Sequence, residues 1–115
     1  MNDYNFHKLA DKLFFTIEKK IDDYNGKSDI DCEIYHNMIE ITFENKSKII
    51  INRQEPLQQI WLATKKSGYH FEYVKKEWIC NRTKKELWTV LEQSCSDQAN
   101  EKIIFTVPRN ITYKN

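Results

Sequence analysis

The chain of 115 residues is long enough for one domain with a single hydrophobic core, and its 40% hydrophobic and 30% charged content is typical of a soluble globular protein. No apolar run approaches the roughly 20 residues that a membrane helix requires, and the first residues have neither the basic region nor the apolar core of a signal peptide. We therefore expect a cytoplasmic protein with no membrane partner.

The net charge of +1 hides an uneven distribution of charge along the chain. Residues 1–44 carry ten acidic residues against five lysines, whereas the remainder carries seven acidic against thirteen basic residues. A chain divided in this way is expected to present separate negative and positive faces, provided that the fold keeps its two parts apart.

Apolar residues recur at helical spacing from about Asp3 to Tyr24, which predicts a first helix with one buried stripe. The stripe consists of Phe6, Leu9, Ala10, Leu13, Phe14, Ile17 and Ile21. The pair Asn25-Gly26 tolerates left-handed backbone and is expected to end this helix.

Six strands are predicted after the first helix. Residues 29–34 alternate strictly between acidic and apolar side chains, residues 38–44 bury every second side chain, and residues 49–51 are an isoleucine run of the kind that forms a buried strand. Pro56 cannot donate to a sheet, so the chain is expected to turn there before a fourth strand at 59–63. Residues 69–73 and 78–80 supply the last two strands.

The second half of the chain is expected to end in a helix. Thr83 and Glu86 have the spacing of a capping box, which predicts a helix running to about Gln98. Residues 103–107 then form either a short strand or an extended segment between the helices, and Pro108 stops it. We expect one domain over residues 1–107, with 108–115 as a loosely held tail.

These elements predict an α+β fold. Helix, six strands and helix make a two-layer α/β sandwich, in which an antiparallel six-stranded sheet is covered on one face by the N- and C-terminal helices. The other face of the sheet is left open.

The fourth strand places a tryptophan on this open face. If Ile60 and Leu62 face the core, Trp61 points outward among amide side chains. Exposed aromatics surrounded by amides are typical of partner-binding surfaces, although Trp61 as an ordinary core residue is the alternative. The predicted partner-binding residues, which we call the open-face patch, are Asn52, Gln54, Gln59 and Trp61.

A second candidate site is a group of carboxylates at the end of the first helix and along the first strand. We call it the acidic ridge, and it consists of Glu18, Asp22, Asp23, Asp29, Asp31 and Glu33. Carboxylates without paired histidines or cysteines suit hard cations, and an exposed ridge lacks the enclosure that gives tight binding. Weak, exchangeable metal binding is expected, and a merely solvated face is the alternative.

The central residues 51–63 read I-N-R-Q-x-P-L-x-Q-x-W-L-A, and W-I-C-x-R follows at residues 78–82. Together with the acidic helix and strand, these motifs resemble the bacterial frataxins, the CyaY family, over about Asp3 to Phe105. The resemblance implies a frataxin-like sandwich that binds iron at the acidic ridge. It also implies docking on a cysteine desulfurase and an iron–sulfur scaffold protein, and so regulation of iron–sulfur cluster assembly.

The acidic ridge departs from the pattern of this family at four positions. Relatives often have further acidic residues where this sequence has Lys19, Lys20, Asn25 and Lys27. A lower capacity for metal is therefore expected. The resemblance is compatible with a monomer that forms metal-dependent oligomers.

Catalysis has little support in the sequence. It contains no Ser/His/acid constellation, no HExxH motif and no glycine-rich phosphate loop, so we do not expect an enzyme. A ferroxidase-like iron oxidation and a metal-independent acidic interaction module are the alternatives. The three cysteines are too scattered for a disulfide framework and are expected as buried free thiols.

Lysine pairs near aromatic residues invite a nucleic-acid interpretation, with Trp61 as a stacking platform. The acidic ridge would repel phosphate, and lysine enrichment accompanies a general bias toward lysine, asparagine and isoleucine. We therefore expect no nucleic-acid partner.

Overall fold

The structure is a computed structural model that describes residues 1–105. Over these residues, two helices and six strands follow one another, with a short 3-10 helix, η1, between the third and fourth strands. Their bounds are α1 (Asp3–Asp22), β1 (Ile30–Ile34), β2 (Met38–Phe43), β3 (Lys48–Gln54), η1 (Glu55–Leu57), β4 (Gln59–Ala63), β5 (Gly68–Val74), β6 (Glu77–Cys80) and α2 (Leu87–Ala99).

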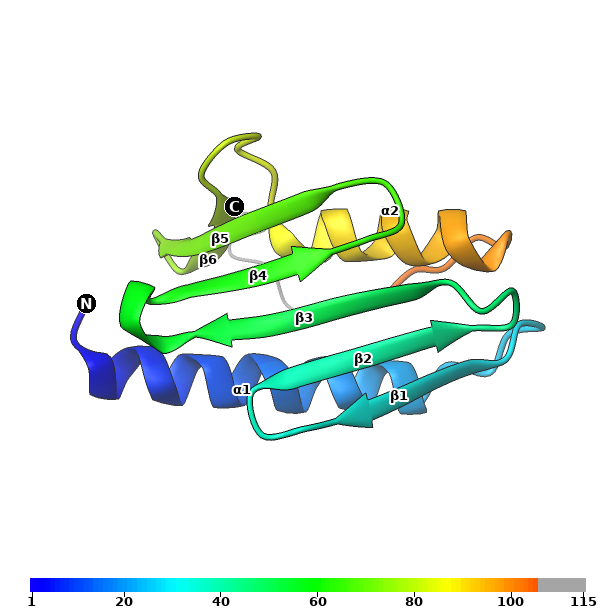
Figure 1. Cartoon of the computed structure of the whole chain (residues 1–115), viewed down its shortest axis with the longest axis horizontal. Helices are drawn as coiled ribbons and strands as arrows, with labels where there is room; N and C mark the ends of the chain where they lie inside the picture. Colours follow the sequence, from blue (N-terminus) through cyan, green and yellow to red (C-terminus); the bar gives the residue numbers. More distant parts are fainter. Residues whose placement is uncertain (106–115) are drawn as a thin grey trace, which may run out of the picture.

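The strands form one antiparallel sheet in the order β1-β2-β3-β4-β5-β6, so each strand pairs with its neighbour in sequence. Both helices lie on the same face of this sheet, α1 behind β1 to β3 and α2 behind β4 and β5 (Figure 1). The predicted two-layer sandwich with one open face is confirmed. Among residues 1–105, no helix has the length and apolar character needed to cross a membrane.

The core lies between the sheet and the two helices. Alternate residues of β2, β3 and β4 point inward and are fully buried, as Ile41, Ile51 and Ile60 illustrate. They pack against the apolar stripe of α1 and the buried side of α2 in one hydrophobic cluster. Since the inward positions are filled, the outward positions of the same strands make up the open face.

Two predicted helix boundaries are wrong in detail. Asp23, in right-handed backbone, caps the end of α1, and neither Asn25 nor Gly26 has a positive φ. At α2 the N-cap is Glu86, whose carboxylate accepts from the amides of Trp88 and Thr89.

The predicted capping box fails because the backbone turns after Thr83. Lys84 has a φ of 64°, so the chain cannot continue as a helix from there. Thr83 instead accepts from the amide of Lys85 at 3.3 Å, and Glu86 pairs with Ile79 in an isolated bridge before the helix begins.

The segment after α2 packs on the core without forming a strand over residues 103–105. Ile103 and Phe105 are buried, and the Phe105 amide donates to Glu92 at 2.7 Å. Of the two expectations for this segment, the short strand is therefore absent from residues 103–105. The rest of it and the expected tail, residues 106–115, lie outside the described residues.

Candidate interaction and metal site

The open-face patch comes together through the pairing of β3 with β4. Asn52 lies opposite Trp61 and Gln54 lies opposite Gln59 in this register. Residues directly opposite each other in an antiparallel pair point to the same face. All four side chains are half-buried, which places Trp61 on the surface of the sheet and not inside the core.

Hydrogen bonds hold the indole of Trp61 in place. Its Nε1–H donates to Oε1 of Gln59 at 2.7 Å, and Nε2 of Gln59 donates to Oε2 of Glu72 at 2.8 Å. Because both the oxygen and the nitrogen of the Gln59 side-chain amide are hydrogen-bonded, Trp61 has a defined orientation before any partner binds.

A stacked histidine completes this arrangement. His70 lies opposite Trp61 in the β4–β5 register, and the two rings stack at 4.1 Å between centroids with 8° between their planes. One face of the indole is therefore covered. Trp61 and His70 also border a shallow hollow of about 150 Å³ that reaches Asn52.

Sequence reasoning missed His70 and Glu72. Both occupy outward positions of β5, between the inward-facing Tyr69, Phe71 and Tyr73. Alternation within residues 69–73 was a signal that they share the open face with Trp61, but contact with it depends on the register between strands.

The acidic ridge is divided by the edge strand β1. Asp31 and Glu33 point to the open face, because Glu33 lies opposite Glu40, an outward residue of β2. Cys32 points to the covered face, where burial, and then the carboxylates of Asp22 and Glu18, raise its pKa to about 11. The helix carboxylates and the strand carboxylates thus flank one edge of the sheet from its two sides.

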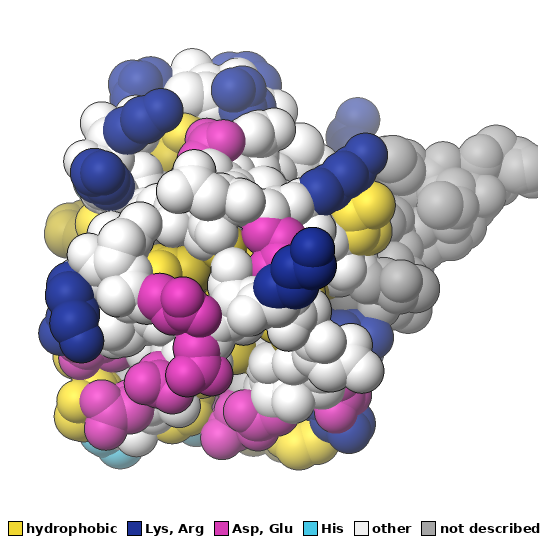
Figure 2. All heavy atoms as spheres, turned by 90° about the vertical axis from the view of Figure 1, so that its right-hand side faces the viewer, with side chains coloured by type: hydrophobic (Ala, Val, Ile, Leu, Met, Phe, Trp, Pro, Cys, Tyr) yellow, Lys and Arg dark blue, Asp and Glu magenta, His cyan; other side chains and the backbone are white. Residues whose placement is uncertain are grey.

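Acidic side chains gather in the lower part of the molecule in Figure 2, and lysines and arginines are concentrated in its upper part. In this view the end of the molecule with the α1–β1 connection faces the reader. The expected separation of negative and positive surface is therefore present on this side.

Local contacts limit what the ridge can hold. Lys19 pairs with Asp23 at 3.4 Å, and the amide of Asp29 donates to Glu44 at 2.6 Å. Within residues 1–105 no group of three or more His, Cys, Asp or Glu side chains is arranged to hold a metal ion. The ridge supplies hard oxygen donors, but not an assembled coordination site.

On the open face near the ridge, Glu40 is already engaged. Its carboxylate hydrogen-bonds the ammonium of Lys48, and this contact lowers the pKa of Glu40. The hydroxyl of Tyr35 lies 3.5 Å from Glu33 and 3.4 Å from Glu40, and these two carboxylates raise its pKa. The lysine reduces the negative charge beside Glu33.

Of the three free cysteines, Cys80 and Cys95 are buried as expected, while Cys32 is half-buried. Burial raises the pKa of Cys95 to about 12, which keeps it a thiol at neutral pH.

Comparison with known proteins agrees with this architecture. A model of the frataxin-like domain matches residues 1–101. A frataxin from Psychromonas ingrahamii, studied within the CyaY protein family, is 40% identical and superposes with a TM-score of 0.85, covering 93% of this chain and 100% of that one.

Yeast frataxin shares the fold at lower identity. One structure is 22% identical with a TM-score of 0.70, covering 84% of this chain and 82% of that one. A trimeric frataxin from Saccharomyces cerevisiae complexed with ferrous iron is 20% identical with a TM-score of 0.64, covering 88% of each chain.

Proposed function

Because the chain belongs to the frataxin-like family, we propose that it is an iron-binding regulator of iron–sulfur cluster assembly that docks on a cysteine desulfurase and its scaffold protein. The observation that carries this proposal is the pre-ordered Trp61, which Gln59 and His70 hold on the open face of the same sheet whose edge strand β1 carries Asp31 and Glu33. It would work in the cytoplasm as an adaptor and not as a catalyst.

The two parts of this surface would contribute differently to docking. The exposed carboxylates set the encounter rate with a basic partner and its dependence on salt. Trp61 contributes most of the affinity, because a large aromatic side chain that is already ordered loses little entropy on binding.

Iron would be a cargo of this protein and not a resident cofactor. The yeast relative complexed with ferrous iron supports a role in binding it. The oxygen donors of the acidic ridge suit ferrous and ferric ions, but all except Glu18 are exposed and β1 splits them, so ions would bind weakly and exchange readily. The chain would be a monomer that forms oligomers on metal binding, and the trimeric yeast frataxin structures support oligomer formation.

A metal-independent interaction module is the second candidate. It is favoured by the lack of a three-ligand group among residues 1–105. This candidate predicts that partner binding does not respond to iron.

The deciding experiment measures capture of the desulfurase and its turnover, each with and without ferrous ion. The double variant Asp22→Lys/Asp31→Lys reverses charge on both sides of β1, and Asp3→Lys/Glu77→Lys reverses the same number of charges elsewhere. We expect capture by the wild type and by the control pair, and at least a roughly tenfold weaker affinity for the ridge pair. Equal capture by all three proteins would refute docking through the ridge.

Iron dependence separates the two candidates in the same assay. If the chain regulates through iron, ferrous ion changes the desulfurase rate with the wild type and not with the ridge pair. A rate that is independent of iron but sensitive to the ridge pair supports the metal-independent module. Oxygen consumption with ferrous ion and no partner would instead reveal ferroxidase activity.

A further inference from the structure

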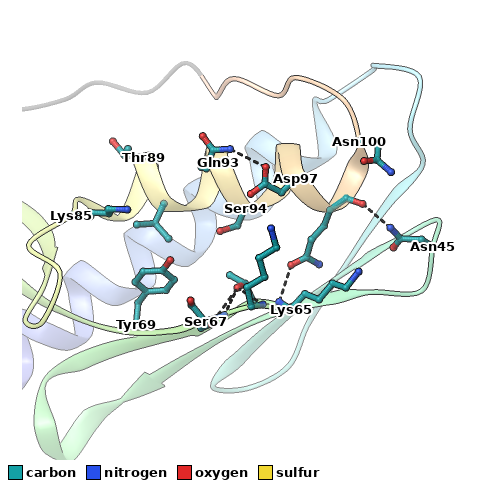
Figure 3. Close-up of a pocket in the computed structure, with 14 residues that line it drawn as sticks. Asn45, Lys65, Ser67, Tyr69, Lys85, Thr89, Gln93, Ser94, Asp97 and Asn100 are labelled. Atoms are coloured by element: carbon teal, nitrogen blue, oxygen red, sulfur yellow. Dashed lines mark hydrogen bonds between the residues drawn. The ribbon is translucent and has the colours of Figure 1, made fainter.

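A cavity of about 490 Å³ with both polar and apolar lining lies between α2 and the turn that joins β4 to β5 (Figure 3). Tyr69, an inward residue of β5, lines it, so the cavity opens on the helix-covered side of the sheet. Trp61 and His70 lie on the opposite face and do not line it. The cavity is therefore separate from the surface proposed for docking.

The charged side chains that line this cavity are mainly positive. Within residues 1–105 they are Lys65, Lys66 and Lys85, opposed by Asp97 alone. Asp97 accepts from Nε2 of Gln93 at 2.9 Å, whereas the three lysines form no ion pair with any residue between 1 and 105. Figure 3 shows Lys85 reaching toward the space between α2 and Tyr69. Three ammonium groups against one carboxylate give the described lining of the cavity a net positive charge, which attracts an anion.

The wall of the cavity is fixed in place by a buried glutamine. Gln98 is only 6% exposed, and its Oε1 accepts from the amide of Lys65 at 3.0 Å. Its Nε2 donates to Oγ of Ser47 at 2.9 Å and to the carbonyl of Lys48 at 3.2 Å. These bonds fasten the β4–β5 turn and the start of β3 to α2, so the cavity exists before a ligand binds.

The cavity is also lined by hydroxyl groups that can bind a ligand. Oγ1 of Thr64 already accepts from the amides of Lys66 and Ser67, so these amides are occupied. The hydroxyls of Ser94 and Tyr69 line the cavity, and neither hydrogen-bonds another residue in the described part of the chain. A ligand would meet ammonium groups and free hydroxyls, which is a donor set suited to phosphate oxygens.

We propose that this cavity binds a small molecule that carries a diphosphate. Its volume is that of a small-molecule site, and lysines lie both on the turn and before α2, so two linked phosphates can meet both groups. A nucleic acid fits less well, because a polymer needs an extended track of positive charge and Asp97 lies at the cavity. The diphosphate would come either as the free inorganic ion or as part of a nucleotide.

The test is a titration of the isotope-labelled full chain with inorganic pyrophosphate, followed by NMR at two salt concentrations. We expect saturable shifts confined to residues 64–69 and 85–98. Lys66→Gln/Lys85→Gln should weaken binding about tenfold, because each of the two ammonium–phosphate interactions that it removes has only a modest effect at a partly exposed site. Lys12→Gln/Lys76→Gln removes the same charge outside the cavity and should change affinity by less than about twofold.

A cavity-filling variant and a second ligand test the site independently of its lysines. Ser94→Leu fills the cavity but keeps every lysine, so it should also weaken binding. Tighter binding of ADP than of pyrophosphate would identify a nucleotide as the source, and equal binding would identify the free diphosphate. Shifts spread over all lysines, equal weakening in the control pair, or affinity for short RNA that rises with its length would each overturn the proposal.

Discussion

The buried guanidinium of Arg53 donates from Nη1 to the exposed carboxylate of Asp11 at 2.8 Å, joining the end of β3 to α1. The same guanidinium lies 4.6 Å from the ring centroid of Phe14 and 3.4 Å from Oε2 of Glu55. Arg53 is part of the motif at residues 51–63, and its position shows that this arginine has a structural role. It holds η1 and the neighbouring open-face patch against the helix.

We predict that Arg53→Ala lowers the free energy of unfolding by about 2–3 kcal/mol, since it removes a packed side chain and leaves a cavity over Phe14. Asp11→Ala should cost only about 1 kcal/mol, because Asp11 is exposed and Glu55 remains near the guanidinium. Urea denaturation measures both values. A larger loss for Asp11→Ala than for Arg53→Ala would contradict this ranking.

For the open-face patch, we predict that Trp61→Ala weakens the proposed desulfurase binding by about 2 kcal/mol, or roughly thirtyfold. Its effect on the free energy of unfolding should be smaller, about 1 kcal/mol, because the indole is only half-buried. Calorimetric titration and urea denaturation give the two values. Thr42→Ala, another half-buried position on the open face, is the control and should leave binding unchanged.

His70→Ala tests whether the stack positions the indole. We predict a fluorescence change of Trp61 and a loss of binding smaller than that of Trp61→Ala, with little change in unfolding free energy, since His70 is exposed. Unchanged fluorescence and unchanged binding would show that the stack has no positioning role.

The predictable parts of this molecule are those encoded by local patterns. Alternation around Ile60 and Leu62 was enough to place Trp61 on the open face, because a strand sends successive side chains to opposite sides. The stack on His70 was not predictable, since it depends on the register between β4 and β5. The division of the acidic ridge was missed for a related reason. Asp22 and Asp31 are close in the sequence, but only the fold shows that Asp22 lies on the helix-covered side of β1 while Asp31 points to the open face.

The start of α2 shows the same limit at a helix end. Thr83 and Glu86 have the right spacing for a capping box, but Lys84 turns the chain and moves the cap to Glu86. We predict that Glu86→Ala lowers the free energy of unfolding by about 1 kcal/mol, whereas Thr83→Ala costs clearly less. Chemical denaturation of both variants measures the difference. Equal losses of unfolding free energy in the two variants would indicate that Thr83 also caps the helix.

Glu101 joins the end of α2 to the α1–β1 connection. Its carboxylate accepts from the amides of Lys27 and Ser28, each at 2.9 Å, and lies beside the Tyr24 hydroxyl. Tyr24 and these two amides lower the pKa of Glu101 to about 2, while burial, followed by the Glu101 carboxylate, raises the pKa of Tyr24 to about 12. Since the folded state favours the ionised carboxylate, Glu101 stabilises the fold when it is charged.

Because folding lowers the pKa of Glu101, the stability that its carboxylate contributes depends on pH. The contribution of Glu101 is complete above its ordinary pKa of 4.5 and is lost as pH falls toward about 2, where the folded form also takes up the proton. We therefore predict that Glu101→Gln melts at a lower temperature than the wild type at pH 7, and that the gap narrows between about pH 5 and pH 2. Calorimetry across this range measures it. Asn45→Ala is the control. It removes a 2.9 Å hydrogen bond from the Asn45 side-chain amide to the Gln98 carbonyl, neither of which titrates. The difference in melting temperature between this variant and the wild type should therefore not narrow between about pH 5 and pH 2. A gap for Glu101→Gln that stays constant down to pH 2 would contradict the lowered pKa.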